Sequence, residues 1–90
     1  MVTTILSHEV KDYEVWKKGF DGDAANRTAM GVKVTGLYRA ADKPNMVTVI
    51  TEVPSVEAIK AFIANPDLRA TMEKLGVIGA PQVMILNKVG

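Results

Sequence analysis

The chain has few side chains that could transfer a proton near neutral pH. It contains no cysteine and a single histidine, His8, whose ordinary pKa of about 6.5 lets it take up and release a proton in this range. His8 ends a β-branched run that is typical of a strand, directly before a predicted helix. We therefore predict His8 as a general base or polarising donor. The alternative is a half-exposed histidine that is bonded to a nearby backbone group.

Two arginines are the candidates for stabilising negative charge. Counting 100° per residue from Tyr13, Arg27 falls within about 40° of the centre of an apolar helical stripe. A guanidinium that points at a sheet needs a carboxylate, carbonyls or a ligand anion, so Arg27 either anchors an anionic ligand or pairs with a structural acid. Arg39 and Tyr38 are neighbours on a predicted strand and point to opposite faces, so only one of them can share a pocket with His8.

Aromatic side chains form a second group of candidates. Tyr13, Trp16 and Phe20 recur at three- and four-residue steps and therefore lie on one face of a helix. We predict that these three residues, together with Tyr38, bind a flat aromatic ligand. The alternative is that the stripe only fills the space between the helix and the sheet, as most such stripes do.

Motifs for metals and nucleotides are missing from the sequence. One histidine and no cysteine exclude a multi-histidine cage and thiolate zinc sites. The acidic stretch at Asp21 lacks the ligands of an EF-hand loop, because Ala25, Asn26 and Val32 occupy the later positions. The glycines form neither a P-loop nor a GxGxxG turn. We predict a protein without a metal or cofactor.

Composition limits the class of protein. Ninety residues make one domain, residues 1–90, and a hydrophobic fraction of 48% indicates a packed core. A formal net charge of +1 argues against nucleic-acid binding. No stretch approaches the ~20 apolar residues of a membrane span, and no leader-like segment begins the chain. We therefore expect a cytoplasmic protein without a membrane partner.

The candidate residues depend on six predicted elements. Asp12, Ser55 and Asn65 stand where helix N-caps belong, and Pro66 suits a first helical position. The elements are a strand over 2–8, a helix over 12–31, strands over 32–40 and 46–53 joined by the loop 41–45, a helical region over 55–76 interrupted at 65–66, a turn at 79–81 and a strand over 82–89. The order β-α-β-β-α-β predicts an α+β, ferredoxin-like fold with a four-stranded antiparallel sheet and the helices on one face.

The last two strands are apolar on both sides. Met46 and Ile50 lie opposite a row of valines, and Met84 and Leu86 alternate with Val83. A sheet with one wet face should alternate apolar and polar residues, and the helices can cover only one face. We therefore predict a homodimer through the second sheet faces. The alternative is that these residues are scattered surface side chains.

Segments of the chain resemble the antibiotic biosynthesis monooxygenase-like superfamily. The resemblance rests on the run from His8 to Asp21, the stretch Asn65-Pro66-Asp67-Leu68 and the stretch from Gly76 to Pro81. It implies a dimeric α/β barrel, in which two ferredoxin-like protomers pair their sheets, and a pocket between sheet and helices in each protomer. Because the family's haem-degrading members have an iron-binding histidine in the second helical region, where this chain has none, the resemblance does not extend to that branch.

Two functions follow as expectations. The first is a cofactor-independent monooxygenase, cyclase or isomerase of a small ring compound, in which His8 moves the proton and Arg27 or Arg39 stabilises negative charge. Oxygenases of this kind need no metal because the substrate anion itself supplies electrons to O₂. The second is a non-catalytic module that binds a small aromatic or anionic ligand, or that assembles only through its dimer surface.

Overall fold

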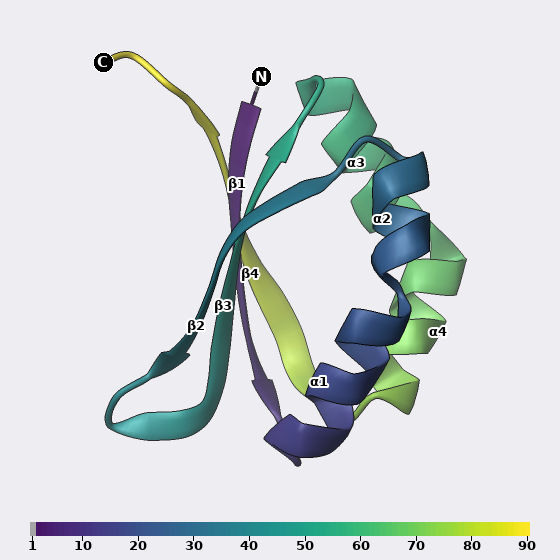
Figure 1. Cartoon of the computed structure of the whole chain (residues 1–90), viewed down its shortest axis with the longest axis vertical. Helices are drawn as coiled ribbons and strands as arrows, with labels where there is room; N and C mark the ends of the chain where they lie inside the picture. Colours follow the sequence, from purple (N-terminus) through teal and green to yellow (C-terminus); the bar gives the residue numbers. More distant parts are fainter. Residues whose placement is uncertain (1) are drawn as a thin grey trace.

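Residues 2–90 are described by a computed structural model (Figure 1). The elements are β1 (Val2–Val10), α1 (Tyr13–Gly22), α2 (Ala24–Ala29), β2 (Lys33–Ala40), β3 (Lys43–Val53), α3 (Val56–Ala64), α4 (Pro66–Lys74) and β4 (Val77–Asn87). The strands form one antiparallel sheet in the order β2-β3-β1-β4. Figure 1 shows all four helices on one side of the sheet. The predicted ferredoxin-like α+β fold is confirmed.

Side-chain caps fix where three of the helices begin, as the sequence predicts. The Asp12 carboxylate accepts hydrogen bonds from the backbone N–H groups of Glu14 and Val15, at 2.9 and 3.3 Å. Ser55 Oγ accepts from the backbone N–H of Ala58, and Asn65 caps α4 in the same way ahead of Pro66. Each cap satisfies a backbone donor that has no partner within its helix.

The prediction of one helix over 12–31 is wrong, because the helix breaks at Asp23. Residue Asp23 adopts φ −93° and ψ 7°, so that α1 ends at Gly22 and α2 begins at Ala24. Glycine lowers helix stability by about 1 kcal/mol relative to alanine, and it stands directly before the break. Both helical regions are therefore pairs of short helices, which lets each region bend over the sheet.

Two strand boundaries also differ from the predictions. The hairpin turn contains only residues 41–42, because β3 begins at Lys43 and pairs with Ala40. The predicted turn at 79–81 is a bulge inside β4, which continues from Val77 to Asn87. Pairing with β1 resumes on both sides of the bulge, at Ile78 with Glu9 and at Gln82 with Ser7. Gly79 at φ 72° supplies the left-handed conformation that such a bulge requires.

The hydrophobic core consists of two separate clusters under the helical layer. One cluster joins Val2, Val32, Val53 and Ile59, and the other joins Val10, Trp16, Val47 and Val49. Between them, β1 and β3 present the buried polar residues Thr4, Thr51 and His8 to the helices. The middle of the covered face is therefore less apolar than its two ends.

The other face of the sheet carries no helix, and we call it the open face. Its central row is Ile50, Ile5 and Met84, which are paired across three strands. Met84 is 54% exposed and Leu86 is 36% exposed on the edge strand β4. Tyr38 lies on the same face of β2, opposite Thr48, and is 59% exposed.

A glycine lets α1 approach the end of α4. A Cβ atom on Gly19 would lie 2.1 Å from Leu75 Cδ2 and 2.9 Å from Leu75 Cγ. Leu75 packs against the cluster that contains Trp16, so it cannot move without loosening that cluster. The same helix also contains Gly22, where a Cβ atom would meet nothing within 4 Å.

We expect Gly19→Ala and Gly22→Ala to change stability in opposite directions. Gly22→Ala removes freedom from the unfolded chain and should raise the free energy of unfolding by about 0.5–1 kcal/mol. Gly19→Ala restricts the unfolded chain in the same way but forces Leu75 out of place. Because such overpacking costs about 1–3 kcal/mol, the free energy of unfolding should decrease. Thermal unfolding followed by circular dichroism measures both variants. A Gly19→Ala protein as stable as Gly22→Ala would contradict the close approach.

Candidate functional site

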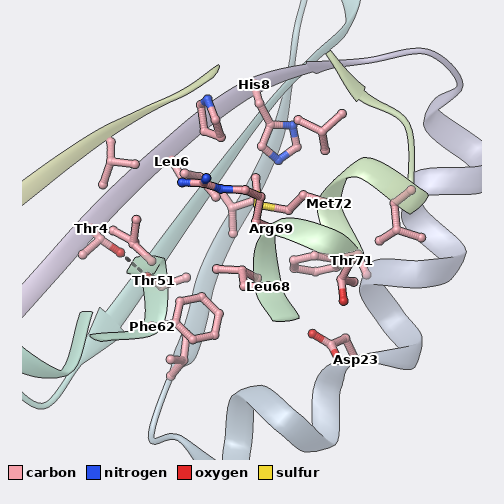
Figure 2. Close-up of a pocket in the computed structure, with 18 of the residues that line it drawn as sticks. Thr4, Leu6, His8, Asp23, Thr51, Phe62, Leu68, Arg69, Thr71 and Met72 are labelled. Carbon is pink, nitrogen blue, oxygen red and sulfur yellow. Dashed lines mark hydrogen bonds between the residues drawn. The ribbon is translucent and has the colours of Figure 1, made fainter. Parts of the chain in front are cut away.

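A cavity of about 390 Å³ lies between the covered face of the sheet and the helices (Figure 2). This volume falls within the range of about 300–1,000 Å³ that is usual for small-molecule sites. Its floor comes from β1 and β3, and helices α1, α2, α3 and α4 with the β4 bulge form its walls. The residues that line the floor are Thr4, Leu6, His8, Val49 and Thr51.

The polar residues of the floor are not equally satisfied. The hydroxyl groups of Thr4 and Thr51 hydrogen-bond to each other across β1 and β3. By contrast, the buried Nδ1 atom of His8 has no hydrogen-bond partner within residues 2–90. An unpaired buried polar atom costs about 1–3 kcal/mol, so the fold holds His8 in this position at a cost to stability.

Burial keeps the imidazole of His8 neutral. The residue is 4% exposed, and this burial lowers its pKa below the ordinary value, although an interaction with its own backbone acts in the opposite direction. A neutral imidazole has one nitrogen that can accept a proton. In Figure 2 the ring faces into the cavity. The unpaired strand segment of the β4 bulge lies beside it, since His8 is the β1 residue that the bulge skips.

An aromatic row extends from His8 along α1. Trp16 meets His8 edge to face, with 5.4 Å between ring centroids, and stacks on Phe20 at 4.9 Å. Tyr13 packs on the other side of Trp16 at 6.1 Å. The helical spacing of these residues produces the row, because side chains three and four positions apart are neighbours on a helix. Trp16 and Phe20 line the cavity, so a flat ligand would meet their rings.

The two arginines that the sequence singled out lie at opposite ends of this row. The guanidinium carbon of Arg27 lies 3.9 Å from the centre of the Phe20 ring, and that of Arg39 lies 3.9 Å from the centre of the Tyr13 ring. Arg27 lines the cavity. Burial lowers the pKa of Arg27, whereas the charges of Asp23 and Asp21 raise it.

The structure thus gathers four of the seven candidates at the cavity: His8, Trp16, Phe20 and Arg27. Tyr13 lies behind Trp16, and Arg39 stacks on Tyr13 while its Nε donates a hydrogen bond of 2.8 Å to the carbonyl oxygen of Pro44. Tyr38 lies on the open face, and its ring covers Gly36. The expectation that Tyr38 and Arg39 point to opposite faces is confirmed.

Arg69 is a cavity residue that the sequence analysis did not single out. At 100° per residue it lies roughly 110° from the centre of the stripe formed by Leu68, Thr71, Met72 and Leu75, which suggests a solvent-facing position. A long side chain can nevertheless reach back over apolar surface. Arg69 lines the cavity together with Leu6 and His8 of the floor, and Figure 2 draws its side chain among the lining residues.

Two further features complete the description of residues 2–90. No group of three or more histidine, aspartate or glutamate side chains in this part of the chain is arranged to hold a metal ion. Likewise, none of the helices described above is both long and apolar enough to cross a membrane.

Comparison with known proteins gives matches only among solved structures. No protein-family model and no curated protein sequence matches the chain. A putative antibiotic biosynthesis monooxygenase from Caulobacter crescentus CB15 aligns with a TM-score of 0.76 and 21% identity, over 99% of this chain and 90% of that chain. Another from Bordetella bronchiseptica aligns with a TM-score of 0.78 and 19% identity, over 98% and 96%. The chain has the antibiotic biosynthesis monooxygenase-like fold.

This monooxygenase-like fold is shared by proteins of other descriptions. An uncharacterized NIPSNAP domain protein from Burkholderia xenovorans aligns with a TM-score of 0.67 and 11% identity, over 99% of this chain and 95% of that chain. One fold commonly serves several functions, so function has to be argued from the site. In this chain the site is the cavity with His8, the aromatic row and the arginines.

We expect His8 to make the protein less stable at mildly acidic pH. Because its pKa is lower in the folded protein than in the unfolded chain, the unfolded chain takes up the proton first as the pH falls through about 6.5. The contribution of neutral His8 to the free energy of unfolding is therefore fully present above this pH and is lost progressively below it. Thermal unfolding at pH 7.5 and 5.5 should show a larger decrease in Tm for the native protein than for His8→Gln. Equal decreases would contradict a buried neutral His8.

Proposed function

We propose that the protein is a cofactor-independent oxygenase of a small aromatic or enolisable ring compound, which it binds in the cavity. The observation that carries the proposal is the buried, neutral imidazole of His8, which faces a cavity walled by Trp16 and Phe20. A general base has to be unprotonated at the working pH, and a neutral imidazole meets this condition. The fold shared with monooxygenase-like proteins is consistent with this function.

The reaction would begin with proton transfer to His8. With a phenol such as 1-naphthol, His8 takes the hydroxyl proton, and the resulting anion is electron-rich enough to reduce O₂. A C–O bond then forms at the ring carbon para to the oxygen. That carbon loses its hydrogen as the O–O bond breaks, which gives 1,4-naphthoquinone and one molecule of water. One atom of O₂ enters the product and the other leaves in water, so the substrate supplies all the electrons.

Other cavity residues would hold the ring and stabilise its charge. Trp16 and Phe20 offer aromatic faces, and stacked rings gain about 0.5–1.5 kcal/mol beyond the area that they bury. Arg27, held over Phe20, would place a positive charge near the developing anion. Positive charge fixed in an apolar site stabilises a developing anion more than water does.

Turnover of 1-naphthol tests the proposal. We expect the native protein to consume O₂ in the presence of 1-naphthol and to form a quinone that carries one ¹⁸O atom from ¹⁸O₂. His8→Gln keeps the side-chain size but removes the base, and should lower the rate about 10²–10⁴-fold. The matched control is Ser7→Ala, because Ser7 is the neighbouring residue of β1 and bonds Thr48 on the open face at 2.9 Å.

The outcomes separate an enzyme from a binding module. Quinone formation that survives His8→Gln would contradict the role of His8. Binding of 1-naphthol without turnover, measured by quenching of the single tryptophan, would instead indicate a non-catalytic ligand-binding protein. If 1-naphthol neither binds nor reacts, the cavity is not a site for flat ring compounds of this size.

We also propose that two copies of the chain pair through the open face. The row of Ile50, Ile5 and Met84 gives this face an apolar centre, and Leu86 and Met46 extend it. Lys33 and Glu52 are register partners at one end of β2 and β3, so that charges of opposite sign lie at this border of the face. A face with an apolar centre and a charged rim is typical of a stable interface between protein chains, and two-fold dimers are the commonest assembly.

Met84→Glu should convert this dimer to a monomer. A carboxylate from each copy would then be buried in the interface, where unpaired charge is strongly unfavourable. Sedimentation velocity measures the change in mass. Val15→Glu is the matched control, since Val15 is also 54% exposed but lies on α1. If both variants and the native protein sediment as monomers, the pairing is contradicted.

A further inference from the structure

We propose that the ligand of the cavity carries an anionic group and that Arg69 binds this group. The inference rests on the proposed function of the cavity as a site for a flat ring compound. Arg69 belongs to α4 and lines the cavity. Although the residue is exposed, its side chain lines the same cavity as Thr4, Leu6 and His8 of β1, and Figure 2 draws it with them.

The guanidinium of Arg69 is free of the interactions that occupy the other two arginines near the site. Within residues 2–90, Arg69 makes no ion pair, no side-chain hydrogen bond and no stacking contact with an aromatic ring. Arg27, in contrast, stacks on Phe20 beside the charges of Asp23 and Asp21. Arg39 stacks on Tyr13 and donates to a backbone carbonyl. Arg69 therefore has all its donors available to a ligand.

The acids around the cavity do not neutralise Arg69 in the structure. Asp23 accepts a hydrogen bond of 2.6 Å from Asn26 Nδ2, and Figure 2 shows it apart from the guanidinium group of Arg69. Glu73 lies one helical turn after Arg69, and among residues 2–90 no ion pair joins the two. A ligand carboxylate could therefore bind this guanidinium without displacing an ion pair of the described residues.

The arrangement specifies a class of ligand. A carboxylate can accept two parallel hydrogen bonds from a guanidinium, while the aromatic body extends under Trp16 and Phe20. His8 lies on the same floor, so the reacting part of the ring would lie near its imidazole. The site therefore fits a small aromatic or enolisable carboxylic acid better than its neutral amide.

The test compares 2-naphthoate with 2-naphthamide, which has nearly the same shape but no charge. Isothermal titration calorimetry at low ionic strength gives both affinities, and fluorescence of Trp16, the chain's single tryptophan, reports binding at the cavity. We expect the native protein to bind the acid about tenfold more tightly than the amide, since hydrogen bonds to charged groups are stronger than neutral ones and Arg69 is partly screened by water. Arg69→Gln should abolish this preference and leave the affinity for the amide unchanged.

Lys74→Gln is the matched control, because it removes one positive charge from the same helix at a residue that does not line the cavity. It should keep the tenfold preference. If the native protein binds both compounds equally well, the anionic ligand is refuted while the proposed function stands. A preference that survives in Arg69→Gln refutes the role of Arg69. Failure of both compounds to bind refutes the proposed function of the cavity itself.

Discussion

The space beneath the helices exists because the helical layer packs on the sheet at two places rather than one. One cluster fixes the helices around Ile59, and the other fixes α1 through Trp16. The breaks at Asp23 and Asn65 make each helical region a pair of short helices, so neither region has to lie flat along the whole sheet. Every residue of the candidate site lies at or beside the resulting cavity. The chemistry of these residues depends on the distance between the helices and the sheet.

The same gap determines the electrostatics of the site. His8 projects from the central strand β1, where it pairs with Val47 of β3 and is skipped by the β4 bulge, and its side chain has low access to water. Low access to water favours the neutral imidazole, and the absence of a partner for Nδ1 within the described residues leaves its hydrogen-bonding capacity unused. The arginines differ in their surroundings, because Arg27 and Arg39 stack on aromatic rings whereas Arg69 lines the cavity without such a contact among the described residues.

Much of this architecture could be predicted from interactions between residues that are close in the sequence. Capping residues such as Asp12 and Ser55 depend on near neighbours, so the starts of their helices could be predicted from the sequence. The β4 bulge could not, because it exists only through pairing with β1. Arg69 was missed for another reason: helical geometry places its Cα off the inner stripe, and only the length of its side chain brings the charge to the cavity. Trp16, Phe20 and Arg27 could be predicted because helical periodicity places them on the inner face, and His8 because it is the single histidine, at the end of a predicted strand.

The β4 bulge has a consequence for how the protein can diversify. Ser7 and Glu9 are two positions apart on β1, whereas their partners Gln82 and Ile78 are four apart on β4. The residues between them, Gly79, Ala80 and Pro81, line the cavity but belong to no rung of the ladder. Changes at Ala80 can therefore reshape the wall of the cavity without disturbing the strand that carries His8. During selection for a new ligand, the bulge can vary while the neighbouring strand β1, which carries His8, stays unchanged.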